Sequence, residues 1–354
     1  MGILDRYIGF TIAYSTFFTL LILLSLFTFF TFAGELNNTR GAYDSFQALE
    51  FSVLTMPSML YQIFPAAALI GTMSGLGTLA GNSELVAMRA AGYSLRRLLR
   101  SVFVFSFVLM LTVALIGEYL APRAQTFAET RRSLAQSGGQ GALVQGGVWL
   151  RDGRQFIHIG KIANNGRLED VNIFHLNTNQ RLDEYKEIAS AVNLTGSHWN
   201  LVDYSEFKMD GDTVEVHRFD NTTDTTFISK NILNMVSVKP ETMSAQAAYQ
   251  YINYLEDNGI DASQYRQAFW MKVTTPLATF VMVMLAIPIV MGSIRTLTAG
   301  HRILIGTLTG IGFYLLSQVF AYIGLVYEFS PIVAALFPIV TFGLVAYRLM
   351  KRVR

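Results

Sequence analysis

The sequence has no cysteine and few charged residues. Of its 354 residues, 52% are hydrophobic and only 15% are charged, whereas soluble domains are about a quarter charged. Without cysteine the chain has no disulfide, no thiol nucleophile and no Cys-ligated zinc or iron–sulfur site. The 26 Phe and 16 Tyr residues exclude a disordered chain. Together these features argue against an ordinary soluble enzyme.

Motifs that carry catalysis are also missing. The sequence contains no G-x-x-x-x-G-K-[ST] phosphate loop, no G-x-S-x-G elbow and no H-E-x-x-H. Glu118 and Glu328 lie near the ends of apolar segments, so neither supplies the midplane carboxylate of a proton-driven carrier. Four of the five histidines fall in predicted strands, where polar strand edges are a simpler reading than a metal cluster: His158, His175, His198 and His217. We therefore expect no catalytic residue, no metal site and no cofactor.

Charge is concentrated in one internal segment. Residues 122–267 hold 32 of the 52 charged residues, 18 acidic and 14 basic. The rest of the chain contains six apolar segments of the ~20 residues that a membrane-spanning helix needs: 11–33, 57–80, 98–121, 268–292, 303–327 and 330–350. The second contains Gly71 and Gly75, small residues that let helices approach closely in lipid. We predict three domains: spans one to three in 1–121, a polar insert in 122–267, and spans four to six in 268–354.

Lysine and arginine orient these spans, because short cytoplasmic loops are enriched in them. With the N-terminus in the cytoplasm, 11 of the 13 basic residues outside the insert lie on the cytoplasmic side. Arg40 and Lys272 are the two on the opposite side. We therefore expect both termini to be cytoplasmic and residues 122–267 to face outward.

The insert has the pattern of a β-domain. Asp152-Gly153 separates two alternating runs, and Asp-Gly favours a hairpin with a type I′ turn. Further runs and turn clusters follow, with strands expected at 168–176, 186–194, 198–205 and 213–219. Such spacing is typical of a small sandwich or barrel, and we expect a jellyroll-like sandwich. An apolar-periodic helix is predicted at about 243–257, ended by Asn258-Gly259.

A short helix is predicted in the loop after the second span, over residues 82–92. Ser83 is placed to cap it and Gly92 to end it, and Glu84, Leu85, Val86, Met88 and Arg89 lie on it. Such a helix suits docking into a soluble partner, and it equally suits a position on the lipid surface.

The chain resembles the lipopolysaccharide export permeases, the LptF/LptG family, along nearly its whole length. The motifs that carry this resemblance are spread along the chain in order: Leu4-Asp5-Arg6-Tyr7, Ser83-Glu84-Leu85 with Ala91-Gly92, Gly117-Glu118, Ala121-Pro122, Trp149 with Asp152-Gly153, Tyr254-Leu255, Gly259, Trp270, Lys272, Gln318 and Pro338. The Leu-Asp-Arg-Tyr start favours the LptG branch. The resemblance implies a polytopic α-helical inner-membrane protein of a Gram-negative bacterium, with six transmembrane helices (3+3) and an inserted periplasmic β-jellyroll-like domain.

The resemblance also implies partners. It predicts a permease subunit of an ATP-driven exporter, paired with an LptF-like paralogue, two copies of an LptB-like ATPase and a single-span LptC-like jellyroll protein. The substrate would be lipopolysaccharide, extracted from the outer leaflet and passed to a periplasmic β-jellyroll bridge. Residues 82–92 would form the coupling helix, with Glu84, Leu85, Met88 and Arg89 meeting the ATPase. ATP hydrolysis belongs to the partner, and no nucleic acid is expected.

Substrate contacts follow from the chemistry of lipid A, a phosphorylated glycolipid that attracts basic side chains. The candidates at the outward end are Lys272, Arg132, Arg131, Arg123 and Arg40. A solvated helix face for Arg131 and Arg132, and snorkelling for Lys272, remain alternatives. The cavity for acyl chains is assigned to Phe27, Phe30 and Thr31 in span one, and to Phe313, Leu316 and Phe320 in span five. Thr31 stands where the family pattern suggests a lysine, and lipid-facing or helix-packing roles are open for all six.

Other functions fit less well. A permease of another envelope-lipid or lipoprotein exporter is the main alternative, but the lipoprotein type places a large outer domain after the first of four spans. A membrane-embedded enzyme would need convergent polar residues at one depth. A simple anchor for the β-domain would not need six spans and a docking helix.

Overall fold

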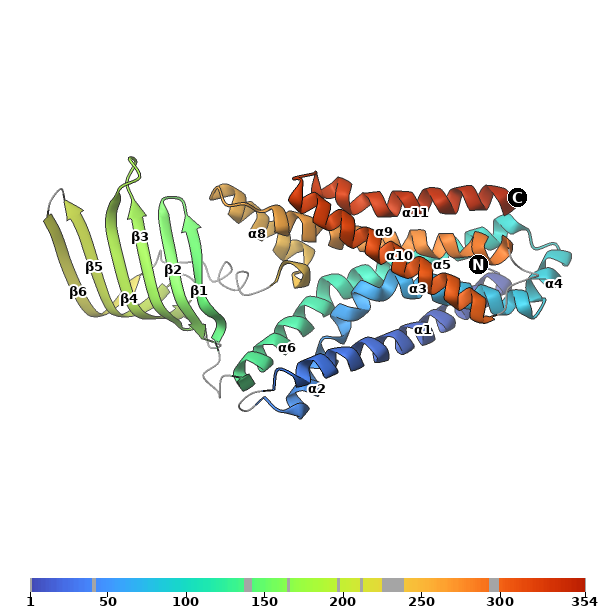
Figure 1. Cartoon of the computed structure of the whole chain (residues 1–354), viewed down its shortest axis with the longest axis horizontal. Coiled ribbons are helices and arrows are strands. Elements are labelled where there is room, and N and C mark those ends of the chain that lie inside the picture. The colour runs from blue at the N-terminus through green and yellow to red at the C-terminus, as the bar shows by residue number, and fades with distance from the viewer. Residues whose placement is uncertain are drawn as a thin grey trace.

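The computed structural model describes residues 2–39, 43–136, 142–163, 166–195, 198–210, 213–224, 239–292 and 299–353. A helical bundle occupies one part of the molecule and a β-sheet the other (Figure 1). Its helices are α1 (Ile3–Leu36), α2 (Ser45–Leu54), α3 (Met56–Gly81), α4 (Glu84–Ala90), α5 (Leu95–Leu115), α6 (Ala121–Gln136), α8 (Ala245–Asp257), α9 (Ser263–Gly292), α10 (Ala299–Val326) and α11 (Pro331–Val353), with short turns η1 (Ile116–Leu120) and η2 (Pro240–Thr242).

The six predicted spans are confirmed. Six described helical segments are long and apolar enough to cross a membrane, and each overlaps its predicted range. The third differs in length, because the helix runs without a break from Leu95 to Gln136. The helix therefore continues past residue 121, where the domain boundary is predicted, and that boundary stays a prediction. The π-helical turn η1 joins α5 to α6, and Gly117 within it leaves room for the Tyr61 ring.

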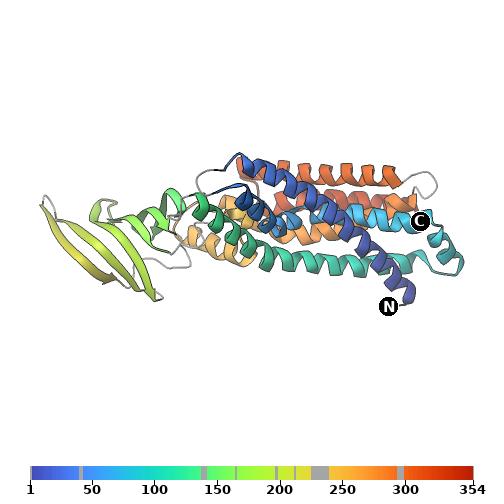
Figure 2. The same ribbon diagram turned by 90° about the horizontal axis from the view of Figure 1, so that it is seen from below.

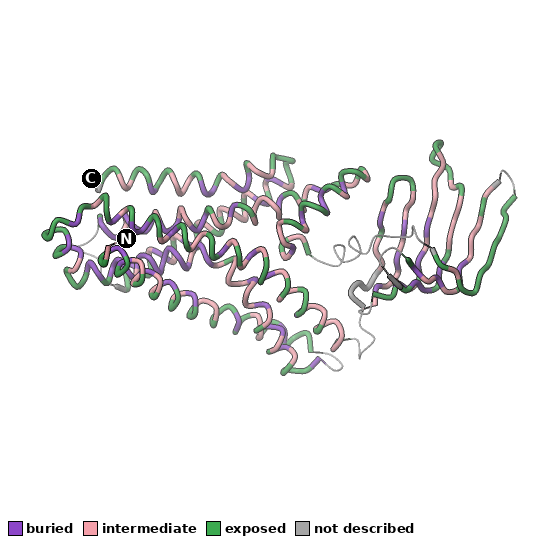
Figure 3. Tube along the Cα trace, turned by 180° about the vertical axis from the view of Figure 1, so that it is seen from behind, coloured by how far each residue is buried: buried purple, intermediate pink, exposed green. Residues whose placement is uncertain are grey.

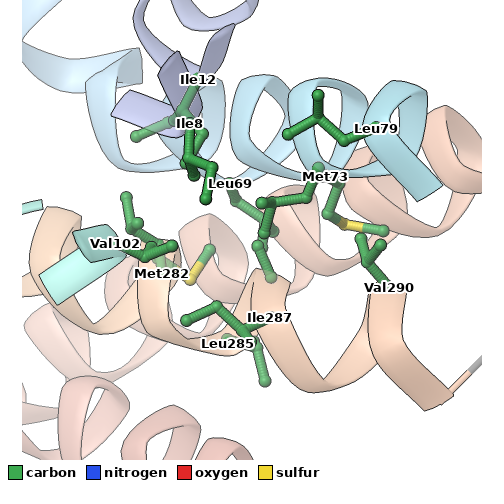
Figure 4. Close-up of a cluster of buried hydrophobic side chains, with 14 of the residues drawn as sticks. Ile8, Ile12, Leu69, Met73, Leu79, Val102, Met282, Leu285, Ile287 and Val290 are labelled. Atoms are coloured by element: carbon green, nitrogen blue, oxygen red, sulfur yellow. The ribbon is translucent and has the colours of Figure 1, made fainter. Parts of the chain in front are cut away.

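The core of the bundle lies where α1, α3, α5 and α9 meet. Figure 4 shows its buried side chains, among them Ile8 of α1, Met73 of α3 and Val102 of α5. Helix α3 is the most buried of the six spans and α1 the least (Figure 3). A Cβ on Gly71 would overlap the backbone of Thr16, and one on Gly75 would lie 3.1 Å from the Thr11 carbonyl oxygen. The prediction that small residues of the second span serve close helix packing is confirmed.

The two ends of the molecule carry different structural elements. Both chain termini and α4 lie at one end of the bundle, and the β-sheet lies at the other (Figures 1 and 2). Helices α6 and α8 connect the bundle to the sheet. The predicted α8 is confirmed, with Ser244 as its N-cap and Gly259 at a φ of 65° just beyond its end. The Tyr254 hydroxyl donates to the Arg151 carbonyl (2.7 Å) and the Gly153 N–H to Asn258 Oδ1 (2.7 Å), so α8 holds the first hairpin.

The six described strands form one antiparallel sheet in chain order, and each overlaps a predicted run. They are β1 (Ala142–Asp152), β2 (Gln155–Ala163), β3 (Leu168–Leu176), β4 (Leu182–Thr195), β5 (His198–Asp210) and β6 (Thr213–Asp224). The first hairpin is confirmed, but its two-residue loop is Gly153-Arg154, one position later than expected. Gly153 has a φ of 57° while Arg154 does not have a positive φ. A glycine with positive φ at the first loop position is the pattern of type II′, not type I′.

A line of four residues bends this sheet. Gly160, Asp170, Ala189 and Asp203 lie side by side across β2 to β5. Asp170 and Asp203 have φ values of 57° and 51°, a left-handed conformation that aspartate tolerates better than most residues. The buried residues on the two sides of the line are three apart rather than two: Ile159 and Ile162, Leu168 and Val171, Ile188 and Ala191, Leu201 and Tyr204. The extra residue keeps one face inward on both sides of the bend.

The bend gives the described strands a core without a second sheet. The expected antiparallel β-domain is confirmed, but the two packed sheets of a sandwich do not occur among the strands that the structure describes. Trp199, Ile159 and Leu168 are almost fully buried on the inward face. The opposite face carries stacked rings, with Phe174 and Tyr185 centroids 5.1 Å apart and Tyr185 and Phe207 5.4 Å apart. Such cross-strand pairs stabilise the register.

We expect Asp203→Val to destabilise the β-domain by about 1–2 kcal/mol, because a β-branched side chain resists the left-handed backbone at the bend. Urea unfolding of the purified chain, followed by tryptophan fluorescence, measures this, since Trp149 and Trp199 both lie in the sheet. Asp203→Asn is the matched control and should unfold at the parent's urea concentration. Equal midpoints for the Val and Asn variants would show that the bend does not depend on this backbone conformation.

Candidate functional site

Helix α4 is a single, sharply terminated helix at the end of the bundle that carries both termini. Gly92 has a φ of 86°, the Tyr93 N–H donates to the Met88 carbonyl (2.9 Å) and the Gly92 N–H to the Arg89 carbonyl (3.1 Å). This is the Schellman arrangement, so the predicted glycine stop is confirmed. Ser83 is the N-cap residue, but its φ is 60° and its side chain makes no capping hydrogen bond.

The two faces of α4 have different environments. Leu85 and Met88 are buried, 3% and 9% exposed, within the bundle core. They attach α4 to its own chain, and their predicted contact with the ATPase stays a prediction. The outward face presents Glu84, Val86 and Arg89, with Val86 55% exposed. The sequence places Val86 on the helix but predicts no role for it. Spacing alone does not show which apolar residue of a short helix turns inward.

Glu84 is held in place by two hydrogen bonds. The Tyr7 hydroxyl of α1 donates to Oε2 (2.8 Å) and the Asn82 amide donates to Oε1 (3.2 Å). A carboxylate has about four lone-pair sites, so Glu84 retains capacity for an arginine from a partner. Glu84 is half-buried, whereas Arg89 on the same helix and Arg96 and Arg100 on α5 are exposed.

At the other end, α2 and α6 enclose a surface cavity of about 330 Å³ that brings two predicted phosphate ligands together. Arg131 forms an ion pair with Glu50, and Arg132 Nε lies 3.1 Å from Glu35 Oε2. The Tyr43 hydroxyl also donates to Glu35 (3.0 Å). Burial, reinforced by this hydrogen bond, raises the pKa of Tyr43 to about 12, so Tyr43 remains a donor at physiological pH.

The other predicted phosphate ligands are placed differently. Arg123 is exposed on α6 and forms no ion pair within the described part of the chain. Arg40 lies outside the described residues. Lys272 of α9 points inward: its Nζ donates to the Met243 carbonyl and lies 5.7 Å from the centre of the Tyr61 ring. Lys272 therefore fastens the segment before α8 to the bundle, and its predicted contact with phosphate stays a prediction.

Glu118 also fastens the start of α8 to the bundle, and together with Lys272 it forms the junction between the two. Its carboxylate accepts hydrogen bonds from the Ala245 N–H (2.8 Å) and the Gln246 N–H (3.1 Å). These are free donors in the first turn of α8. The junction is therefore a structural joint between the sheet and the spans.

The predicted acyl-chain residues divide between two environments. Phe27 and Phe30 are exposed on α1, at 45% and 62%, and Thr31 contacts Met59. On α10 the rings of Phe313 and Phe320 pack on Phe342 and Phe337 of α11, and Leu316 is half-buried. Phe313 and Phe320 thus contribute to helix packing, and their place on a cavity wall stays a prediction. The exposed apolar side chains of α10 are instead Ile311, Leu315, Val319 and Tyr322, among others.

Comparison with known proteins decides the family. The model of the "Lipopolysaccharide export system permease LptF/LptG" family matches residues 6–352. The chain belongs to the LptF/LptG family. The lipopolysaccharide export system permease protein LptG of Escherichia coli strain K12 is 33% identical over 99% of this chain and 98% of its own length. LptG of Haemophilus influenzae is 32% identical over 99% of both chains.

Membership of the LptF/LptG family agrees with the six spans and the antiparallel insert. It makes the chain a multi-pass inner-membrane permease rather than an enzyme. No three His, Asp or Glu side chains among the residues that the structure describes are grouped to hold a metal ion. For an LptF/LptG permease, the features that need a function are therefore the outward face of α4, the basic cavity between α2 and α6, and the exposed surfaces of α1 and α10.

Sequence patterns did not predict several residues that line these surfaces and the cavity. Glu35, Glu50 and Tyr43 surround the two arginines, and Tyr7 contacts Glu84. The paired side chains are up to 97 residues apart in the case of Glu35 and Arg132. No local pattern reports such pairs, because they form only when α2 folds against α6 and α1 against α4.

Proposed function

We propose that this chain is an LptG-type transmembrane subunit of an ATP-driven exporter. It accepts lipopolysaccharide from the outer leaflet of the inner membrane and releases it towards a periplasmic β-jellyroll bridge. The family match over residues 6–352 carries the proposal. Both termini and α4 face the cytoplasm in this proposal, and the sheet faces the periplasm, because the two lie at opposite ends of the bundle (Figure 1).

The motor is a partner, since the sequence has no phosphate-binding loop of its own. An LptB-like ATPase dimer docks on the exposed face of α4 formed by Glu84, Val86 and Arg89. Glu84 supplies the charge that selects a basic residue of the ATPase, because the neighbouring side chains are cationic. The buried Leu85 and Met88 transmit the position of α4 to the bundle core.

The membrane partners cover apolar side chains that this chain leaves exposed. Phe30 of α1 is 62% exposed and Leu315 of α10 55%, and we assign these surfaces to an LptF-like paralogue and the single span of an LptC-like protein. Together they would enclose acyl chains, with Phe27 and Phe30 on the wall that α1 contributes.

Arg131, Arg132, Arg123 and Arg40 remain the candidates for lipid A phosphates. The Arg131 and Glu50 side chains are 54% and 30% exposed, and exposed ion pairs contribute only about 0–1 kcal/mol. A phosphate group can therefore displace Glu50 at little cost. Arg132 and Glu35 are less exposed, at 29% and 11%, and hold the cavity together.

Affinity purification of the chain from native membranes in mild detergent, with mass spectrometry of proteins and lipids, tests the proposal. A soluble ATPase, a second six-span paralogue and lipopolysaccharide should copurify. Recovery of a different lipid or a lipoprotein with the ATPase would show that the chain serves another envelope exporter. Recovery of the chain alone would overturn the proposal.

Lys272→Glu should reduce lipopolysaccharide-stimulated ATP hydrolysis of the purified complex while the subunits still assemble. The substitution removes the bond to the Met243 carbonyl and places a second carboxylate near Glu118. Arg266→Glu is the matched control, because Arg266 lies on the same helix, is 46% exposed and pairs only at the surface with Glu256. Equal stimulation in both variants would show that the Lys272 junction does not affect transport.

A further inference from the structure

The N-terminal Leu4-Asp5-Arg6-Tyr7 motif carries part of the family resemblance, and its side chains contact the region around α4. Asp5 is 9% exposed and its carboxylate is unusually well bonded. It accepts from the Gly2 N–H (2.7 Å), the Tyr93 hydroxyl (2.6 Å) and the Ser101 hydroxyl (2.8 Å), and Arg97 Nε lies 3.6 Å away. The first turn of α1 is therefore bonded to the link after α4 and to the first two turns of α5.

Tyr7 makes the second connection, two residues further along α1. Its hydroxyl donates to Glu84 Oε2 (2.8 Å), at the first residue of α4. Asp5 holds Tyr93, which follows the Schellman end of the same helix. Helix α4 is thus tied to α1 at both of its ends.

Helix α1 is suited to transmit displacement from this end. It runs from Ile3 to Leu36 without a proline, whereas α3, α9 and α11 each contain one or two inside the helix. At 1.5 Å per residue, Phe30 lies about 35 Å along the helix from Tyr7. Helix α1 is the least buried span, and its closest backbone contacts are with α3 at Gly71 and Gly75.

We propose that Asp5 and Tyr7 are positioning residues that make α1 and α4 one rigid body. The N-terminal clamp, defined as Asp5 and Tyr7 with Tyr93 and Glu84, then has two effects. It orients the Glu84 carboxylate for the ATPase, and it passes each movement of α4 directly to the apolar outer half of α1. This inference rests on the proposed function for what moves α4, but the clamp itself is a property of the chain alone.

The absence of cysteine permits a direct test by double electron–electron resonance. Spin labels at Ile3→Cys and Ala90→Cys report the distance between α1 and α4, since both positions are exposed. We expect a narrow distribution in the purified chain, and a clearly broader one after Tyr7→Phe, which removes one hydroxyl. Asp5→Asn is a second variant with the same expectation. Tyr14→Phe is the control, because Tyr14 is 67% exposed on α1 and its hydroxyl has no hydrogen bond among the described residues.

In the complex, Tyr7→Phe should leave the ATPase bound, since Glu84 keeps its charge. Lipopolysaccharide-dependent ATP hydrolysis should fall about tenfold, the factor that corresponds to the lower range for one hydrogen bond to a charged group. Broadened distances in a chain that binds no ATPase would support the clamp and overturn the proposed function. A distribution as narrow in Tyr7→Phe and Asp5→Asn as in the parent would overturn the clamp, whatever copurifies. Unchanged ATP hydrolysis with broadened distances would overturn its role in coupling.

Discussion

Glu84→Arg is expected to abolish copurification of the ATPase. Glu84 is the one carboxylate on α4, and the change replaces it with a further cation on a surface that already exposes Arg89, Arg96 and Arg100. Removing one member of a hydrogen-bonded charge pair at an interface costs about 2–5 kcal/mol, and placing like charges together costs several more. Either effect alone lowers affinity by at least about tenfold.

The effect of this substitution must be separated from general damage. Glu84→Gln keeps acceptors for Tyr7 and Asn82 and removes only the charge, so it should retain part of the ATPase. Glu328→Arg makes the same charge reversal just after α10, far from α4, and should leave recovery unchanged. An ATPase recovered in full with Glu84→Arg would show that α4 is not the docking helix and would favour its position on the lipid surface.

Gly71→Ala should displace α1 from α3 and lower the stability of the whole chain. The added Cβ would overlap Thr16 Cα and N, and backbone atoms cannot move aside as a flexible side chain does. Overpacking of this kind typically costs about 1–3 kcal/mol. Because α1 joins the bundle core through its contact with α3, we expect a lower thermal transition and a lower monodisperse fraction in detergent, measured by fluorescence-detected size-exclusion chromatography.

Gly312→Ala provides the comparison for this variant. Gly312 lies in the transmembrane helix α10, and a Cβ there meets no atom within 4 Å. The alanine should therefore behave as the parent or slightly better, since alanine favours helix over glycine. If Gly71→Ala and Gly312→Ala had equal thermal transitions, the close contact between α1 and α3 would not stabilise the fold.

Local patterns predicted the elements well. The six spans, the strands and the stop of α4 at Gly92 depend on runs of apolar residues, on alternation and on backbone freedom at single positions. Each of these is a property of neighbouring residues. The first hairpin is instructive, because Asp152-Gly153 located the turn while the pairing of Asp152 with Gln155 moved the loop by one residue. The register of a hairpin depends on both strands, and a dipeptide does not contain that information.

Side-chain roles were predicted less well. The spacing of Leu85, Val86 and Met88 predicted a helix, but the bundle core decided that Leu85 and Met88 turn inward and Val86 outward. Arg131 and Arg132 were expected to be available for phosphate, and the fold brings them against Glu50 and Glu35. Lys272 was expected to face lipid A phosphates, and its amine also donates to the Met243 carbonyl beside the Tyr61 ring. In each case the partner comes from another helix.

Six membrane spans, one polar β-insert and the lack of a motif for ATP hydrolysis all follow from the order of residues along the chain. Hydropathy and turn chemistry suffice for these conclusions, because burial in lipid and backbone conformation act over short stretches of chain. Only the tertiary structure decided how the sheet bends at Asp170 and Asp203, which arginines are paired, and that Tyr7 reaches Glu84. Those contacts join residues distant in the chain, and their energies depend on packing that forms only when the whole bundle has assembled.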